Sequence, residues 1–254
     1  MKIFDVQIDE ITRAQARQKL SEKQVIFTPN PEILLEAQKN APFKAALQKG
    51  SLMLPDGHGL LFVSRLMAIP SRFLRVLLYF PLALLFLIWK APFKAIFPEV
   101  IHGSDFMDDV VQKAADSGWT VYFLGGKEGA AEKTADFFLK KYPKLLLSGF
   151  SALDPHEALA SIQKAAPQVL FIAYGAPKQE LWIAQHFEKI PSLRLVMGVG
   201  GSFDFYSHFI KRAPRGLRLL GLEWFWRLLL NPRQRIRRIV NAVFVFPWKC
   251  LWWL

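Results

Sequence analysis

The feature of this sequence that most limits its fold is a regular alternation of short apolar runs with longer stretches of helical periodicity. The runs predict buried strands at Gln24–Thr28, Leu52–Leu54, Thr120–Leu124, Leu145–Ser148, Val169–Ala173 and Leu195–Val199. The stretches between them predict helices at Pro31–Lys49, Ser104–Ser117, Gly129–Tyr142, Pro155–Ala166 and Lys178–Lys189. Strands that alternate with helices at this spacing predict an α/β fold, with a Rossmann-like parallel sheet and helices on both of its faces.

The charge of the chain divides it further. The net charge of +12 is concentrated in residues 60–98, which carry basic residues and no acid, and in residues 205–254, where Glu223 is the one acid. Both segments are also rich in Leu, Phe and Trp. We therefore expect an α/β domain over residues 1–204 and a basic, Trp-rich, helical appendage over 205–254, with an ordinary basic amphipathic helix packed on its own domain as the alternative for the tail. Basic residues beside aromatic and aliphatic ones favour an anionic membrane surface as the partner over nucleic acid.

An apolar insertion is expected within residues 65–98, where Phe73–Trp89 interrupts the alternation. Seventeen helical residues span about 25 Å, which is at the lower limit for crossing a bilayer. Basic residues on both flanks argue against a crossing, and Pro81 is expected to kink the helix. We favour a helix or helical hairpin that dips into one leaflet, and a buried core helix is the alternative.

Several common sites are not indicated by the sequence. Cys250 is the one cysteine, so neither an intrachain disulfide nor a thiolate cluster is expected, and a buried or lipid-facing thiol is favoured. The histidines lack zinc-ligand spacing, and the acidic residues near Asp105 are expected to begin a helix. We expect no metal and no cofactor. The N-terminus lacks the pattern of a signal peptide, which favours a cytosolic body.

Two loops carry the groups best suited to chemistry. Thr28–Glu32 (TPNPE) and Pro55–Gly59 (PDGHG) each follow an apolar run and are rich in Pro or Gly. Such loops lie at strand ends, where α/β proteins bind ligands. Thr28, Asn30 and Asp56 would supply a hydroxyl, an amide and a carboxylate that can orient a sugar and accept a proton. A helix cap and a turn aspartate are the alternative roles.

Three further loops suggest ligand contacts. Gly125 and Gly126 follow a strand and precede a helix, where backbone N–H groups can approach a diphosphate. Lys178 and Gln179 open another helix and are expected to point toward the crevice near Asp56, although Lys178 could simply be solvated. Gly201 belongs to a glycine-rich strand end that permits close approach of a ligand.

These motifs occur in a characteristic order. TPNPE and PDGHG are followed by FLGGKEG, YGAPKQE, GVGGSFDF and KRAP…GLEWFWRLLLNPRQRIRR. As a set they resemble the WecG/TagA/CpsF family, glycosyltransferase family 26, from about residue 1 to 240 with an interruption around 65–98. The resemblance implies a bacterial enzyme at the cytoplasmic face of the inner membrane, bound peripherally or monotopically. It would move a sugar, often N-acetylmannosamine or its uronate, from a UDP donor to an undecaprenyl-diphosphate-linked sugar for cell-surface polysaccharides.

The resemblance also implies roles for individual residues. Asp56 matches the general base of an inverting transfer, Thr28 stands beside it, and Asn30 and Gln179 match positions near the donor sugar. The appendage of the family contacts the membrane and supplies arginines to the donor diphosphate, for which Arg227, Arg233 and Arg237 are the candidates. Because no metal-binding DxD-type motif is evident, cationic side chains are expected to replace Mg²⁺ at the diphosphate.

The sequence departs from the family pattern in two loops and in the longer insertion. The usual RVTGxD reads Val100-Ile-His-Gly-Ser-Asp105, without the Arg and with His102 in place of Thr. Tyr174 stands where a smaller aliphatic residue is common. A non-catalytic membrane protein that binds UDP-sugars or lipid-linked glycans is the alternative function. A nicotinamide-dependent dehydrogenase is disfavoured, because the first strand–turn–helix unit lacks the GxGxxG fingerprint.

Overall fold

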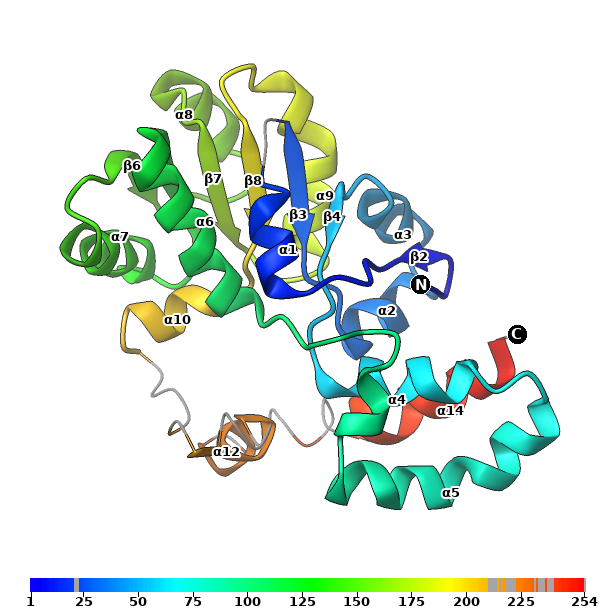
Figure 1. The fold of residues 1–254 in the computed structure, drawn as a ribbon. Helices are drawn as coiled ribbons and strands as arrows, with labels where there is room; N and C mark the ends of the chain where they lie inside the picture. Colours follow the sequence, from blue (N-terminus) through cyan, green and yellow to red (C-terminus); the bar gives the residue numbers. More distant parts are fainter. Residues whose placement is uncertain are drawn as a thin grey trace.

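The protein is built around one six-stranded parallel sheet (Figure 1). The computed structural model describes residues 1–20, 23–209, 214, 216–217, 223–230, 232, 236 and 240–253. The order β4-β3-β8-β7-β5-β6 is formed by β3 (Gln24–Phe27), β4 (Leu52–Met53), β5 (Thr120–Gly125), β6 (Leu146–Ser151), β7 (Val169–Ala173) and β8 (Leu195–Gly198). Every neighbouring pair is parallel. All six predicted strands are confirmed, and with them the predicted α/β class.

Helices cover both faces of the sheet, as the alternation predicts. One hydrophobic core is formed with α2 (Pro31–Ala37), α3 (Ala41–Leu47), α4 (His58–Met67), α8 (Ala158–Ala165) and α9 (Lys178–His186). The other is formed with α1 (Arg13–Gln18), α6 (Gly103–Ser117), α7 (Ala130–Lys141) and α10 (Ser202–Tyr206). Residues of the central strands alternate between the two cores, because successive side chains of a strand point to opposite faces.

The helix predicted over Pro31–Lys49 is two helices. The side chain of Asn40 accepts a hydrogen bond from the backbone N–H of Phe43 at 3.0 Å, which is the geometry of a helix N-cap. Pro42 follows in the first turn, where its missing N–H costs nothing. These two residues end one helix and begin the next, a signal that the apolar periodicity alone does not reveal.

A short hairpin precedes the sheet and was not predicted. It joins β1 (Lys2–Ile3) to β2 (Val6–Gln7) in an antiparallel pair. Phe4 and Asp5 form the turn with φ of 52° and 65°. Both central residues of a type I′ turn have positive φ, and glycine or asparagine usually marks it. Neither residue is present here, so the pattern gave no signal.

The apolar insertion forms α5 (Arg72–Ile88), a single helix that continues through Pro81, followed by the short 3₁₀ helix η1 (Ala91–Lys94). One side packs on α4, where Phe62 contacts Tyr79 and Phe86 with ring centroids 5.6 Å apart in each pair. The opposite side is exposed, with Phe80 77% and Phe73 74% accessible. The alternative of a buried core helix is therefore wrong. Among the residues that the structure describes, no helix is both long and apolar enough to span a bilayer.

The described part of the C-terminal segment ends against the body of the protein. It contains α12 (Glu223–Leu230), a π-helical turn η3 (Asn241–Val245) and α14 (Phe246–Trp253). Phe4 packs edge-on against Phe246 and Trp253, with centroids 5.8 and 5.6 Å apart. Cys250 is fully buried, and burial raises the pKa of its thiol. Thus α14 packs on the α/β body and shares its hydrophobic core, and the division of the chain at residue 204 stays a prediction.

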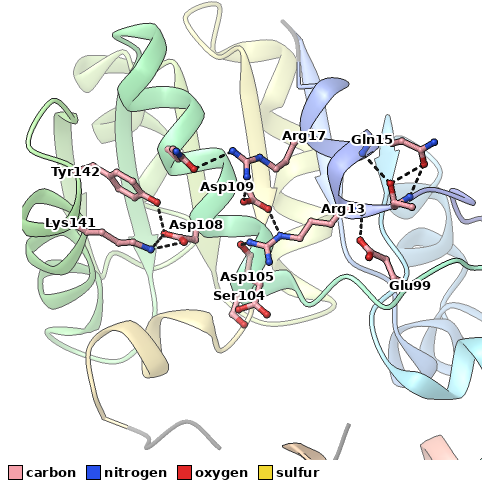
Figure 2. Close-up of polar contacts among 12 residues, drawn as sticks. Arg13, Gln15, Arg17, Glu99, Ser104, Asp105, Asp108, Asp109, Lys141 and Tyr142 are labelled. Atoms are coloured by element: carbon pink, nitrogen blue, oxygen red, sulfur yellow. Dashed lines mark hydrogen bonds and ion pairs between the residues drawn. The ribbon is translucent and has the colours of Figure 1, made fainter. Parts of the chain in front are cut away.

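An ion-pair network holds α6 in place between α1 and α7 (Figure 2). The Arg13 guanidinium pairs with Asp109, and Arg17 approaches Asp109 at 3.3 Å. On the other side of α6, Lys141 pairs with Asp108 at 2.6 Å. The acids near the start of α6 are therefore matched by cations of neighbouring helices, in addition to the helix dipole that their position suggested.

Candidate functional site

The topology brings the loops that carry the motifs to one edge of the sheet. β3 and β8 are neighbours, but β3 leads into α2 on one face and β8 into α10 on the other. Adjacent parallel strands whose connections leave on opposite faces open a ligand crevice at their carboxyl ends. The Thr28 loop and the Gly198–Gly201 loop flank this point, and the Asp56 loop follows the next strand, β4. Helices α4, α5, α12 and α14 gather at this end of the molecule (Figure 1).

Asp56 and His102 form the central polar pair of this edge. The Nδ1 atom of His102 lies 3.0 Å from Oδ1 of Asp56, and the two side chains are 32% and 26% exposed. The backbone fixes the pair: the N–H of Asp56 donates to Pro29 at 3.0 Å, and the N–H of Ile101 donates to Pro55 at 2.8 Å. Three loops distant in sequence are thereby joined at one place that a substrate can reach.

Thr28 lies against the same pair through the start of α6. A Cβ atom added to Gly103 would stand 3.0 Å from Oγ1 of Thr28, which is closer than side chains normally pack. Gly103 directly follows His102. A side chain at position 103 would therefore crowd Thr28. The ends of β3 and β4 and the beginning of α6 thus bring Thr28, Asp56 and His102 to the same place.

His58 stands beside this group at the beginning of α4. Its ring centroid is 6.3 Å from that of His102. Burial, followed by the positive charge of Lys90, lowers the pKa of His58 to about 4. His58 is therefore neutral near pH 7, and it adds no charge to the surroundings of Asp56.

Asn30 caps a helix in this structure. Its Oδ1 accepts hydrogen bonds from the backbone N–H groups of Glu32 and Ile33 at 3.0 and 3.1 Å. The alternative role of a helix cap is thus confirmed for its oxygen. Because the cap fixes the side chain beside Thr28, its amide nitrogen is the atom that can serve a ligand.

The two glycines after β5 have a structural explanation. Gly125 and Gly126 have φ of 87° and 82°, which favour glycine, and a Cβ on Gly125 would lie 2.8 Å from the ring of Tyr174. The N–H of Gly126 donates to the carbonyl of Ala173 at 3.1 Å. The fold therefore uses the N–H of Gly126, and a contact of the other N–H groups of this loop with a diphosphate stays a prediction.

Gln179 lies inside the fold and not at the surface of the crevice. Only 4% of it is exposed. Its Oε1 accepts from the N–H groups of Gly175 and Gly200 at 3.2 and 2.9 Å, and its Nε2 donates to Glu180 at 2.9 Å. Gln179 joins the loops after β7 and β8, so the prediction that it points toward the site of Asp56 is corrected.

The remaining predicted residues lie in three places. Lys178 is exposed at the first position of α9, and Gly201 is exposed just before α10. The loops after β4 and β7 are separated by three strand spacings, about 14 Å, so Lys178 and Asp56 are not neighbours. Arg227 belongs to α12. Arg233 and Arg237 lie outside the described residues.

Metal ligands do not gather at this edge or elsewhere in the described ranges, where no group of three His, Cys, Asp or Glu side chains could hold an ion. The residue of this polar group that the sequence analysis did not select is His102. The sequence marked His102 only as an unusual residue in the Val100–Asp105 motif. Its contact with Asp56 depends on how α6 meets the end of β4.

Comparisons with known proteins place the chain in a family. The model of the glycosyl transferase WecG/TagA/CpsF family matches residues 1–79 and 80–254, two segments that meet within α5. A relative from Bacillus spizizenii is named N-acetylglucosaminyldiphosphoundecaprenol N-acetyl-β-D-mannosaminyltransferase. It is 30% identical over 85% of this chain and 74% of its own length. Proteins of the same name from Bacillus subtilis and Staphylococcus aureus are 29% and 26% identical, over 89% and 88% of this chain and 78% of each relative. The chain therefore belongs to the glycosyl transferase WecG/TagA/CpsF family.

Proposed function

We propose that this glycosyltransferase moves a sugar of the N-acetylmannosamine type from a UDP-sugar to a sugar carried on a lipid diphosphate. The observation that supports it best is the Asp56 carboxylate, held beside Thr28 and His102 at the carboxyl edge of the sheet. The names of the relatives give the acceptor as N-acetylglucosaminyl-diphosphoundecaprenol and the transferred group as N-acetylmannosamine. The product would serve bacterial cell-surface polysaccharide synthesis.

The proposed reaction is a direct displacement with inversion. The acceptor hydroxyl oxygen forms a bond to the anomeric carbon while the bond from that carbon to the phosphate oxygen of UDP breaks. The proton of the hydroxyl leaves toward the Asp56 carboxylate, which acts as the general base. Thr28 and the amide nitrogen of Asn30 orient the sugar. A positioned base commonly contributes about 10²–10⁴-fold to the rate.

Charge on the departing UDP has to be balanced by cations. Lys178 is exposed at the start of α9, and Arg227, Arg233 and Arg237 belong to the basic C-terminal segment. We assign the diphosphate to these side chains and not to a metal. Activity that persists in EDTA supports this assignment, and strict dependence on Mg²⁺ contradicts it.

A lipid-linked acceptor requires the protein to meet a membrane, and an exposed apolar face is suited to this. The apolar face consists of Phe73, Leu77, Phe80 and Leu84 on α5 with Trp248 and Trp252 on α14, and each is about half exposed or more. The spacing of the α5 residues places them on one side of the helix. Arg72 stacks 4.1 Å above the ring of Trp252, which joins the two helices. Tryptophan and arginine are typical of the bilayer interface.

The apolar face lies close to the candidate site. α4 begins two residues after Asp56, and it packs on both α5 and α14. A helix of ten residues is about 15 Å long. A bilayer against the apolar face would therefore lie about one short helix away from Asp56, so a diphosphate-linked sugar could reach the carboxylate while its lipid stays in the membrane. We place the protein peripherally at the cytoplasmic face of the bacterial inner membrane.

Vesicle binding tests the membrane proposal. Replacing Leu77, Phe80 and Leu84 together by Ser should lower the fraction bound to anionic vesicles at least about tenfold, because each buried apolar side chain is worth about 1.5–3 kcal/mol. A matched control replaces Leu139, Leu146 and Phe150, exposed residues of α7 and β6, in the same way. Equal loss in both variants, or no loss in either, contradicts the proposal.

A donor and acceptor panel tests the reaction. Purified full-length protein is incubated with a set of UDP-sugars and a short-chain lipid-diphosphate-N-acetylglucosamine, and glycolipid product is measured. Transfer from UDP-N-acetylmannosamine is the expected result. If UDP binds but no sugar of the set is transferred, the alternative of a non-catalytic sugar-nucleotide binder is favoured. Stabilisation by NAD and not by UDP would revive the dehydrogenase.

A further inference from the structure

We infer that His102 is a catalytic residue, which takes the proton of the acceptor hydroxyl on Nε2 while Asp56 holds and stabilises its imidazole ring. This rests on the proposed transferase function and refines the role of Asp56. It is carried by the contact of Nδ1 with Oδ1 of Asp56 at 3.0 Å.

The chemistry of the pair follows from its hydrogen bond. An ionised carboxylate can only accept, so Nδ1 of neutral His102 carries the proton and Nε2 carries the lone pair. A base works best when its pKa is near the working pH, and histidine at about 6.5 meets this better than aspartate at about 3.9. When Nε2 takes the proton, the imidazolium that forms is stabilised by the Asp56 carboxylate, as in a Ser-His-Asp triad.

The structure holds His102 in place from two sides. It is the N-cap residue of α6, but its side chain makes no cap hydrogen bond to that helix. The first turn of α6 is fixed by Tyr206, whose hydroxyl donates to the carbonyl of Ser104 at 2.5 Å. It is also fixed by Arg13, whose Nη2 donates to the carbonyl of Asp105 at 2.9 Å; both residues are drawn in Figure 2. These anchors fix the backbone of α6 next to His102, which helps to hold its side chain in one orientation, as preorganised catalysis requires.

The charges around the dyad are mixed. The ring of His58, at the start of α4, lies 6.3 Å from that of His102, and Lys90 and Lys94, at the two ends of η1, bring positive charge toward His58. Asp105, in the first turn of α6, adds a negative charge on the element of His102 itself. Asp56 contacts the ring directly, so its removal should change how His102 titrates.

The kinetic test compares substitutions of identical chemistry. His102→Asn keeps an amide donor where Nδ1 stands and removes the nitrogen that accepts the proton. Its kcat should fall at least about a hundredfold, with UDP affinity unchanged. Wild-type kcat should decline as pH falls below the region of histidine titration, since a protonated base cannot act, and this decline should vanish in the variant. His58→Asn is the matched control and should keep the wild-type profile.

Three results would overturn the inference. One is His102→Asn with wild-type kcat and pH profile, which leaves the transferase proposal intact and restores Asp56 as the direct base. Another is loss of the acid-side decline in His58→Asn instead. The last comes from ¹⁵N NMR of the full chain, which needs no activity. The expected spectrum shows the Nδ1–H tautomer of His102. Asp56→Asn should shift its titration downward by about one pH unit. The other tautomer, or an unchanged titration, excludes the dyad even if the protein transfers no sugar.

Discussion

The loop after β4 and the loop after β7 both end strands of the same sheet, and both carry polar side chains that suggested a site. They use those side chains differently. Asp56 is partly exposed and pairs with His102 from another element. Gln179 and Glu180, in the first turn of α9 after that loop, are buried. Gln179 bonds to Glu180 and to the loops after β7 and β8. One loop keeps its polar groups within reach of a ligand, and the other uses them to build the frame.

This difference separates residues that can act on a substrate from residues that position others. A buried amide that satisfies two backbone N–H groups can hardly be spared, since orphaned buried donors cost about 1–3 kcal/mol each. A partly exposed carboxylate contributes less to folding and can change its partners when a ligand arrives. Substitution in the two loops should therefore affect opposite properties, and that contrast can be measured.

The largest effect is expected at Asp56. Asp56→Asn keeps the size of the side chain but removes the negative charge on which proton transfer depends. Turnover should fall about a hundredfold or more while UDP binding persists and the melting temperature stays within a few degrees of wild type. Steady-state kinetics with calorimetry of UDP binding measure this. Asp116→Asn, at an exposed position near the end of α6, is the matched control, and near-normal turnover in Asp56→Asn would sink the assignment.

The opposite result is expected at Gln179. Gln179→Ala leaves the N–H groups of Gly175 and Gly200 and one oxygen of Glu180 without their partner, inside the fold. The free energy of unfolding should fall by about 3 kcal/mol, measured by urea denaturation. Gln163→Ala, on an exposed part of α8, serves as the control. A variant of unchanged stability with lost UDP binding would instead return Gln179 to the ligand site.

How far the sequence predicts this molecule differs between fold and site. The six strands were predictable because buried parallel strands are continuous apolar runs. The predicted helix over Pro31–Lys49 failed at Asn40, where a single cap outweighs apolar periodicity. At the site, the positions of Thr28 and Asp56 followed from their place at strand ends. The burial of Gln179 did not, because a helix of nine residues turns some of its side chains inward, and only packing decides which.

The contact between His102 and Asp56 illustrates the same limit. The two residues are 46 positions apart, and α5 lies between them in sequence. Nothing in the local pattern around His102 indicates that α6 begins against the end of β4. From the sequence, His102 is only an unusual residue in a motif. The three-dimensional structure adds that its ring contacts the Asp56 carboxylate.

A smaller effect, confined to one pH range, is expected at Glu180. Burial raises the pKa of its carboxyl to about 7, and one of its oxygens has no partner among the described residues. The folded state thus holds the proton more tightly than the unfolded chain, whose glutamate titrates near 4.3. Stability from this group is complete below that pH and is lost as the pH rises through about 7.

Glu180→Gln does not titrate, so wild type should lose stability relative to it by on the order of 2 kcal/mol between pH 5 and 8. Urea denaturation of both proteins across this range measures the difference. If the stabilities of wild type and Glu180→Gln change in parallel with pH, Glu180 stays ionised in the fold. The two loops would then differ in how exposed their carboxylates are and not in how those carboxylates titrate.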